Sequence, residues 1–391
     1  MTAPKIATGH FRIHPQERVI FGRPAAEAVV EEMARQGVSR AFVTSTASLA
    51  RAGAEGPLAQ VIAGLGDACV GVHDRIRSHS PEADVVEAAN AARAAGADVL
   101  VAVGGGSVID ATKAVQMCLW TGAGDVEAMR AAGKALAADR GAEGGAMRMI
   151  AVPTTLSAAE FTPTAGITDT DRGVKGGYTH PRLVPRAVAL DPAATLATPL
   201  PLLVSTGMRA MDHAAEGYCS ATANPMTDLF ALAAVETLAR SLPAILAAPE
   251  DLAPRQDAQF GMWQAISALT GGAGSGASHA IGYALGAGFG VPHGETSCIM
   301  LPATLRWNAE VNADRQAALA RALGDPDRPA WEQMLDLVRG LGVPSRLRDK
   351  GLTRADLPRL AELAFDYPPM RRNPRPVDGP KRIEEILDYA F

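Results

Sequence analysis

Short apolar runs alternate with alanine-rich amphipathic stretches along the first half of the chain. The runs at 99–103 and 149–152 are apolar and contain valine or isoleucine, which favour strands. This alternation is typical of a parallel α/β sheet. The pattern predicts strands at residues 18–21, 40–44, 68–72, 99–103, 149–152 and 187–190, and helices at residues 25–36, 49–65, 81–95 and 108–120. Ser80 and Pro81 fit the N-cap and the first position of the helix at 81–95.

The pattern changes after Asp191-Pro192. Long segments rich in alanine and leucine follow, without β-branched runs between them, and this predicts a helical domain. A chain of 391 residues exceeds what one hydrophobic core usually organises, so we expect two domains. Several prolines near residues 195–201 mark the boundary. We therefore predict a Rossmann-like, dinucleotide-binding α/β domain over residues 1–195 and an all-α domain over residues 196–391.

Composition and charge exclude several classes of protein. The net charge of −5 provides no basic stripe for a nucleic acid, so a small-molecule substrate is expected instead. The four cysteines are scattered without C-x-x-C spacing, which indicates reduced structural thiols. The first five residues lead into polar sequence, and no run of about 18 apolar residues follows. We expect a cytoplasmic protein with no membrane segment.

A glycine turn follows the predicted strand at 99–103. Gly104, Gly105, Gly106 and Ser107 lead directly into the helix at 108–120. Glycines allow positive φ and close approach of a phosphate, while the helix N-terminus attracts its negative charge. The turn therefore predicts a site for the pyrophosphate of a dinucleotide. Packing alone is the other interpretation, because this turn lacks the G-x-G-x-x-G spacing.

Two further strand ends carry hydroxyl groups. Thr154 and Thr155 follow the strand at 149–152, at the sheet edge where open α/β folds bind ligands; turn formation is the alternative. The second strand ends in Thr44-Ser45-Thr46, where an acidic residue usually binds the ribose hydroxyls and disfavours a 2′-phosphate. Without that carboxylate, we expect NADPH to be accepted as well as NADH.

Three of the eight histidines lie in the predicted helical domain in a suggestive order. His213 lies within a helical stretch, His279 follows it, and His293 is flanked by Pro292 and Gly294. Imidazoles that converge from separate helices form either a metal site or a polar pocket for proton transfer. Separate histidines buried in the core are the third possibility.

Taken together, these motifs resemble the iron-containing (group III) alcohol dehydrogenase superfamily, nearest its maleylacetate reductase branch. The resemblance implies the dehydroquinate synthase-like fold of that superfamily, an NAD(H) or NADP(H) cofactor, and a homodimer. It rests on Gly-Gly-Gly-Ser-x-x-Asp-x-x-Lys at 104–113, Pro-Thr-Thr at 153–155, Leu-Asp-Pro at 190–192, Gly-Met-x-Ala-x-x-His-Ala-x-Glu at 207–216, His279, and Pro-His-Gly at 292–294. It implies these cofactor-binding residues: Gly104, Gly105, Gly106, Ser107, Asp110, Thr154, Thr155 and Ser45.

The chain departs from the family pattern at two positions. The resemblance implies an Fe²⁺ or Zn²⁺ site at His213, His279 and His293, but Arg209 replaces the aspartate that completes it. A guanidinium on the same helical face disfavours a divalent cation. Tyr283 stands where many members carry a further histidine for proton transfer; it either replaces that histidine or packs as an aromatic. Asp110, by contrast, follows the alcohol dehydrogenases rather than typical maleylacetate reductases.

We therefore predict an NAD(P)-dependent oxidoreductase acting on CH–OH or CH–CH donors. Its substrate is a small carboxylated oxo acid of the maleylacetate type, and no metal is obligatory. Tyr283, His279 and Arg209 are the candidate catalytic residues, with Arg209 either clamping a substrate carboxylate or pairing with Asp212 or Glu216. The alternatives are an Fe²⁺- or Zn²⁺-dependent alcohol dehydrogenase, a lyase of the dehydroquinate synthase kind, and an inactive nucleotide-binding protein.

Overall fold

The computed structural model describes residues 9–138, 144–172 and 174–391, so the first residues of the chain lie outside it. The chain forms two compact units. The first, called here the α/β unit, comprises residues 14–199. The second, called the helical unit, comprises residues 200–391 together with residues 9–13.

A parallel sheet forms the centre of the α/β unit. Its strands stand in the order β1-β8-β5-β4-β2-β3, and each neighbouring pair is parallel. β4 and β5 are buried along their whole length because helices cover both faces. The strands are β1 (Arg18–Phe21), β2 (Ala41–Thr44), β3 (Cys69–His73), β4 (Val99–Gly104), β5 (Arg148–Pro153) and β8 (Ala187–Leu190). All six predicted strands are confirmed to within one or two residues.

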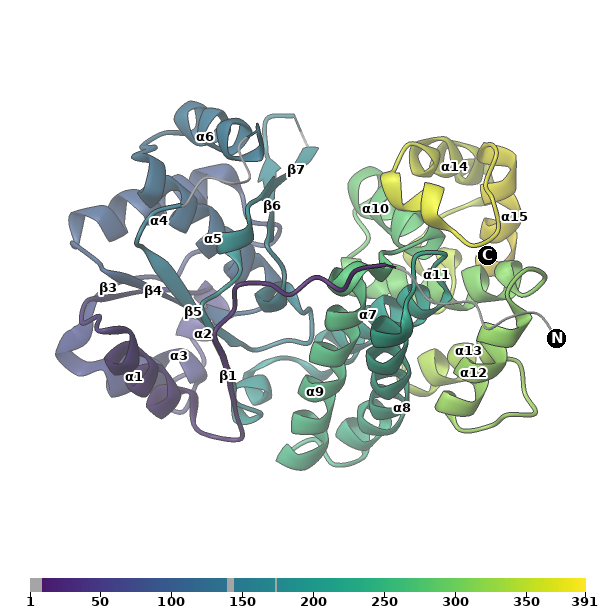
Figure 1. Cartoon of the computed structure of the whole chain (residues 1–391), viewed down its shortest axis with the longest axis horizontal. Helices are drawn as coiled ribbons and strands as arrows, with labels where there is room; N and C mark the ends of the chain where they lie inside the picture. Colours follow the sequence, from purple (N-terminus) through teal and green to yellow (C-terminus); the bar gives the residue numbers. More distant parts are fainter. Residues whose placement is uncertain (1–8, 139–143, 173) are drawn as a thin grey trace. The chain divides into compact units, whose positions relative to one another are not determined.

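Helices form a layer on each side of this sheet (Figure 1). On one face, Val29 and Met33 of α1 and Val61 of α3 pack against strand residues such as Val101 and Ile150. On the other face, α5 packs against β4 and β5, and α4 packs against α5. The helices of the unit are α1 (Ala25–Gln36), α2 (Ala47–Ala50), α3 (Pro57–Leu65), α4 (Glu82–Ala94), α5 (Gly106–Thr121) and α6 (Val126–Ala138).

Some local predictions for this unit are wrong. The helix predicted at 49–65 is two helices, α2 and α3, because the glycine-containing segment between them forms turns. α4 begins at Glu82 with Pro81 as its N-cap, since Ser80 adopts a left-handed φ of 53°. An antiparallel hairpin, β6 (Thr164–Asp169) and β7 (Val174–Thr179), was not predicted, and neither was α6.

The second unit is helical throughout its described residues, as predicted. Its central helix is α7, which is almost completely buried from Leu203 to Cys219 and packs against α8, α9 and α11. The helices are α7 (Leu200–Cys219), α8 (Pro225–Ala247), α9 (Leu252–Ala268), α10 (Ala277–Phe289), α11 (His293–Asn308), α12 (Ala313–Leu323), α13 (Ala330–Gly340), α14 (Leu357–Phe365) and α15 (Pro380–Ala390).

The N-terminal segment is part of the helical unit. The Phe11 ring stacks on that of Phe230 with centroids 5.9 Å apart, and the Arg12 N–H donates to the Gly271 carbonyl at 2.8 Å. A Cβ on Gly271 would lie 2.4 Å from Phe11 Cε2, so this contact requires glycine. The segment therefore completes the packing of helices that are distant from it in sequence.

Among the described residues, one helix, α8, is long and apolar enough by length and composition to cross a membrane. We had found no such segment, because Asp228, Glu236 and Arg240 interrupt its apolar run. In the structure, α8 packs against α7 and α9 and begins with a capping box at Asn224. These contacts are those of a helix within a bundle.

Candidate active site

The glycine turn joins β4 to α5 at positions where neighbouring atoms leave no room for a side chain. β4 ends at Gly104, and Gly105 is the N-cap of α5. A Cβ on Gly104 would lie 2.6 Å from Val108 Cγ2, and one on Gly105 would lie 2.9 Å from Thr155 Cγ2. The first helical hydrogen bond runs from the Val108 N–H to the Gly105 carbonyl, so the N–H groups before it face the helix N-terminus. This geometry suits a bound phosphate.

Ser107 is held by a neighbouring turn. Its Oγ accepts a hydrogen bond from the His79 N–H at 3.0 Å, and its carbonyl accepts one from Ser80 Oγ at 2.7 Å. Both His79 and Ser80 have left-handed φ values, of 65° and 53°. The Ser80 hydroxyl therefore fixes the start of α5. It does not cap α4, so the predicted N-cap role of Ser80 is wrong.

Asp110 and Lys113 connect α5 to the segment around the hairpin. Asp110 Oδ2 accepts a hydrogen bond from the Gly166 N–H at 3.1 Å, and its Oδ1 lies 3.3 Å from Lys113 Nζ. The fully buried Lys113 ammonium also donates to the carbonyls of Ala159 and Thr164. Asp110 thus joins α5 to β6 through the Gly166 N–H, and its predicted contact with the cofactor stays a prediction.

The remaining predicted cofactor residues lie at strand ends. The Thr154 N–H donates to the Gly104 carbonyl at 3.2 Å, and Thr155 Oγ1 lies 3.3 Å from Ser157 Oγ. Ser45 is fully buried, and its Oγ donates to the Val103 carbonyl at 2.8 Å. Its neighbour Thr46 is partly exposed, so Thr46 offers the accessible hydroxyl at this strand end.

In the helical unit, three helices bring polar side chains together. Most of the residues on each helix have a neighbour three or four positions away and therefore lie on the same side of the helix. They are Arg209, Asp212, His213 and Glu216 on α7, Ser278, His279 and Tyr283 on α10, and His293 and Ser297 on α11.

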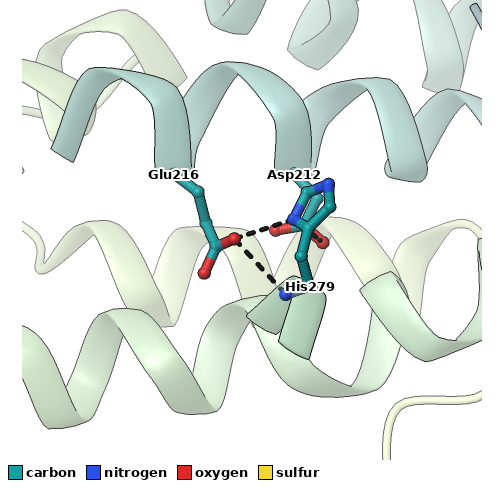
Figure 2. Close-up of side chains that lie close together, drawn as sticks. All are labelled: Asp212, Glu216 and His279. Atoms are coloured by element: carbon teal, nitrogen blue, oxygen red, sulfur yellow. Dashed lines mark hydrogen bonds and ion pairs between the residues drawn. The ribbon is translucent and has the colours of Figure 1, made fainter. Parts of the chain in front are cut away.

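Glu216 binds both the start of α10 and the ring of His279 (Figure 2). Its carboxylate accepts backbone N–H groups from Gly276 at 2.8 Å, Ser278 at 2.7 Å and His279 at 3.3 Å. Glu216 Oε2 also lies 2.7 Å from His279 Nδ1. Burial raises the pKa of Glu216, while the three N–H groups act in the opposite direction.

His279 is neutral at ordinary pH. Burial lowers the pKa of its ring to about 3, and the positive charge of Arg209 adds to this effect. A carboxylate beside Nδ1 places the proton of the neutral ring on that nitrogen. His279 Nε2, which is buried without a hydrogen-bond partner among the described residues, then carries a lone pair and acts as an acceptor.

Asp212 is the centre of a second set of contacts. Its fully buried Oδ2 accepts hydrogen bonds from Ser297 Oγ at 2.7 Å and from Ser278 Oγ at 2.9 Å. Arg209 Nη1 donates to Ser297 Oγ at 3.1 Å and lies 3.8 Å from the same Oδ2. Burial raises the pKa of Asp212, and the positive charge of Arg209 opposes that rise. The ion pair between Arg209 and Asp212 is therefore present.

Tyr283 lies half-buried within an aromatic cluster. Its ring centroid is 6.2 Å from that of His279, 6.1 Å from that of His293 and 5.6 Å from that of Tyr367. The Arg209 guanidinium carbon lies 5.6 Å from the same ring. Tyr283 is thus packed among these residues, while its catalytic role stays a prediction.

The residues fit a divalent metal ion only in part. The rings of His213 and His279 are 5.0 Å apart, and His213 Nδ1 and His279 Nε2 are buried without described partners, as ligand nitrogens require. However, the charge of Arg209 acts on both rings and helps to lower their pKa values. A fixed guanidinium beside the imidazoles repels a second cation, so the set as a whole does not fit the ion.

A second group of potential ligand atoms, on Asp212, Glu216 and His279, lies within 4.8 Å. These atoms already bind one another or serine hydroxyls. The Glu216–His279 distance of 2.7 Å is that of a hydrogen bond, and Asp212 Oδ2 has two serine donors. The three residues therefore orient the site and do not form a cage for an ion.

The structure thus gathers every predicted catalytic and metal residue, namely Arg209, His213, His279, Tyr283 and His293, in the helical unit. It adds Ser278 and Ser297, which the sequence analysis did not predict. It also shows that Glu216 binds the start of α10 and the ring of His279, whereas the sequence suggested only an ion pair with Arg209. Ser278 adjoins His279, and Ser297 lies four residues after His293. That spacing was the available signal, but serine is too common in helices for it to stand out.

Comparisons with known families match both halves of the chain. The family described as iron-containing alcohol dehydrogenase matches residues 15–192. The family described as Fe-containing alcohol dehydrogenase, C-terminal, matches residues 203–391. The predicted fold class, an α/β dinucleotide-binding unit followed by helices, is therefore confirmed.

Individual relatives agree with this assignment. The chain is 33% identical over 375 residues to a maleylacetate reductase of Burkholderia cepacia, covering 96% of this chain and 95% of the relative. A maleylacetate reductase structure from Agrobacterium tumefaciens has a TM-score of 0.82 at 30% identity, covering 99% of both chains. The NAD⁺ complex of a sulfoacetaldehyde reductase from Bifidobacterium kashiwanohense has a TM-score of 0.86 at 23% identity, covering 98% and 99%, and shares the fold.

Proposed function

Since the chain belongs to the iron-containing alcohol dehydrogenase family and is an NAD(P)-dependent oxidoreductase, we propose that it reduces a small carboxylated oxo substrate of the maleylacetate type, without an obligatory metal. One observation carries the proposal. The nearly buried guanidinium of Arg209 lies among His279, Tyr283 and Ser297, at a distance of 3.1 Å from Ser297 Oγ. A cation in such surroundings needs an anionic partner, and the carboxylate of a substrate can add to Asp212.

Each side chain has a task in this reaction. The nicotinamide supplies the hydride. Arg209 binds the substrate carboxylate through donors other than Nη1, which is already engaged by Ser297 and Asp212. Tyr283 donates the proton, because His279 is neutral with Nε2 as an acceptor and has no proton to give there.

Substitution of Arg209 tests the proposal. In Arg209→Met, which keeps an unbranched side chain but removes the charge, we expect kcat/KM for an oxo acid to fall about 100-fold, the value of a lost charge-assisted bond. The same ratio for an uncharged aldehyde should change little. Arg209→Lys, which retains a point charge without the planar fork, should recover part of the loss. Unchanged kinetics toward oxo acids would contradict the proposal.

A metal-dependent alcohol dehydrogenase is the second candidate. The buried nitrogens of His213 and His279, with rings 5.0 Å apart, favour it, and His293 would complete the ligand set. Activity that disappears on dialysis against a chelator and returns with zinc or iron would support this candidate. Under our proposal, dialysis leaves activity unchanged, whereas Arg209→Asp gains affinity for the ion and loses oxo acids as substrates.

We also propose that the protein is a homodimer in the cytoplasm and that it binds neither nucleic acid nor a membrane. The cofactor preference is proposed to include both NADH and NADPH. Strict use of NADH in a comparison of the two KM values would contradict that part.

A further inference from the structure

Ser297 connects the cation and the anion of the helical unit. Its hydroxyl donates to Asp212 Oδ2 at 2.7 Å and accepts from Arg209 Nη1 at 3.1 Å. The direct distance between Nη1 and Oδ2 is 3.8 Å, which is too long for a hydrogen bond. The hydroxyl therefore completes the link between two charges that do not bond each other directly.

Ser278 provides a natural comparison. It is as deeply buried as Ser297, at 1% exposure, and donates to the same Asp212 Oδ2 at 2.9 Å. Within the described residues, however, Arg209 contacts Ser297 and not Ser278. The hydroxyl groups of the two serines thus differ in their contact with the guanidinium.

We propose that Asp212 and Ser297 are positioning residues that hold the Arg209 guanidinium in the orientation in which it receives a substrate carboxylate. The inference rests on the proposed function. The guanidinium is planar and presents its donors in a fixed fork, so anchoring Nη1 sets the directions of Nε and Nη2 as well. Tyr283, whose ring lies 5.6 Å from the guanidinium carbon, restricts it further.

The charges of the site make this anchoring necessary. Arg209 and Asp212 lie three residues apart on α7, and their side chains are 11% and 0% exposed. A nearly buried cation without a counter-ion is unfavourable, so Asp212 keeps Arg209 in the site when no substrate is present. The 3.8 Å between Nη1 and Oδ2 leaves no direct hydrogen bond to fix the orientation of the guanidinium. Ser297 therefore bridges the gap.

The test compares Ser297→Ala with Ser278→Ala, alone and combined with Arg209→Met. We expect Ser297→Ala to raise KM for an oxo acid about 10-fold with a smaller change in kcat, as loss of a bond to a charged group implies. Ser278→Ala should change KM less than threefold. In the Arg209→Met background, Ser297→Ala should have no further effect, because its role depends on the guanidinium. Equal effects of the two serines, or an undiminished effect in that background, would overturn the inference.

Crystal structures of the two serine variants give a second readout that does not depend on the substrate. The guanidinium should move away from Asp212 in Ser297→Ala and keep its place in Ser278→Ala. A guanidinium that stays in place in Ser297→Ala overturns the inference, even if oxo acids are the substrates. If it moves while oxo acids and aldehydes are affected alike, the inference stands and the proposed carboxylate substrate fails.

Discussion

At the scale of single residues, Glu160 is the most unusual side chain of the α/β unit. It is fully buried, and neither carboxyl oxygen has a hydrogen-bond partner among the described residues. Burial raises its pKa from 4.5 to about 7, although the nearby Lys113 ammonium opposes the shift. Glu160 thus remains largely protonated in the folded protein under mildly acidic conditions.

This shift predicts a pH dependence of stability. Below pH 4.5 the carboxyl is neutral in both states, so its full contribution to stability is present there. As the pH rises to about 7, the unfolded chain ionises first, and on the order of 3 kcal/mol is lost. Glu160→Gln should remove this dependence. The Tm of the variant should therefore rise relative to that of the wild type as the pH increases from 4.5 to about 7.

Thermal melts at a series of pH values provide the measurement. Glu55→Gln, at an exposed position, is the matched control and should follow the wild-type profile. Parallel profiles for Glu160→Gln and the wild type would show that the pKa of this carboxyl is the same in the folded and unfolded chain, and would contradict the prediction.

The sequence indicated the reacting side chains better than their supports. His213, His279 and His293 stood out because histidine is rare and its chemistry is distinctive. Ser278 and Ser297 contact Asp212 across 66 and 85 positions of sequence. Such a contact depends on how α7, α10 and α11 pack, which no local pattern encodes. The supporting hydroxyls therefore required the structure.

At the scale of elements, the strands were predictable and the hairpin was not. The buried strands consist of β-branched and apolar residues, which have a strong local signal. β6 and β7 contain Gly166, Gly176 and Gly177, whose weak strand propensity hides the pairing. α2 and α3 were merged because alanine and leucine continue across the turn between them. Local composition thus predicted the elements whose own residues have a strong preference for that structure.

The end of β2 predicts how cofactor preference can be changed. Thr46 caps α2 by accepting the Leu49 N–H at 3.4 Å, and aspartate caps a helix equally well. Thr46→Asp should keep the fold while placing a carboxylate where an acidic residue binds the ribose in related folds. We expect the KM for NADPH to rise about 10-fold relative to that for NADH, through repulsion of the 2′-phosphate.

Thr46→Asn, which has the same shape without the charge, separates repulsion from steric effects. It should leave the ratio of the two KM values close to that of the wild type. If the wild type, Thr46→Asp and Thr46→Asn all have the same ratio of KM for NADPH to KM for NADH, the adenosine ribose does not bind at this strand end.

At the scale of the whole molecule, the proposed homodimer predicts that two copies of the chain associate. Light scattering after size exclusion should then give twice the 40.5 kDa mass of one chain. The mass should not change between low and high protein concentration if the interface is of the obligate type. A mass of one chain throughout that range contradicts the expectation.

The N-terminal segment has a consequence for how the protein is made. Phe11 and Arg12 are synthesised before the α/β unit, whereas their partners, Phe230 in α8 and Gly271 just after α9, are synthesised after it. The segment must therefore wait, unpaired, while the α/β unit folds ahead of it. For the same reason, a fragment that starts at Leu200 lacks the ring that covers Gly271. The helical unit is assembled from segments on both sides of the α/β unit, so it can complete its packing only after the α/β unit has been synthesised.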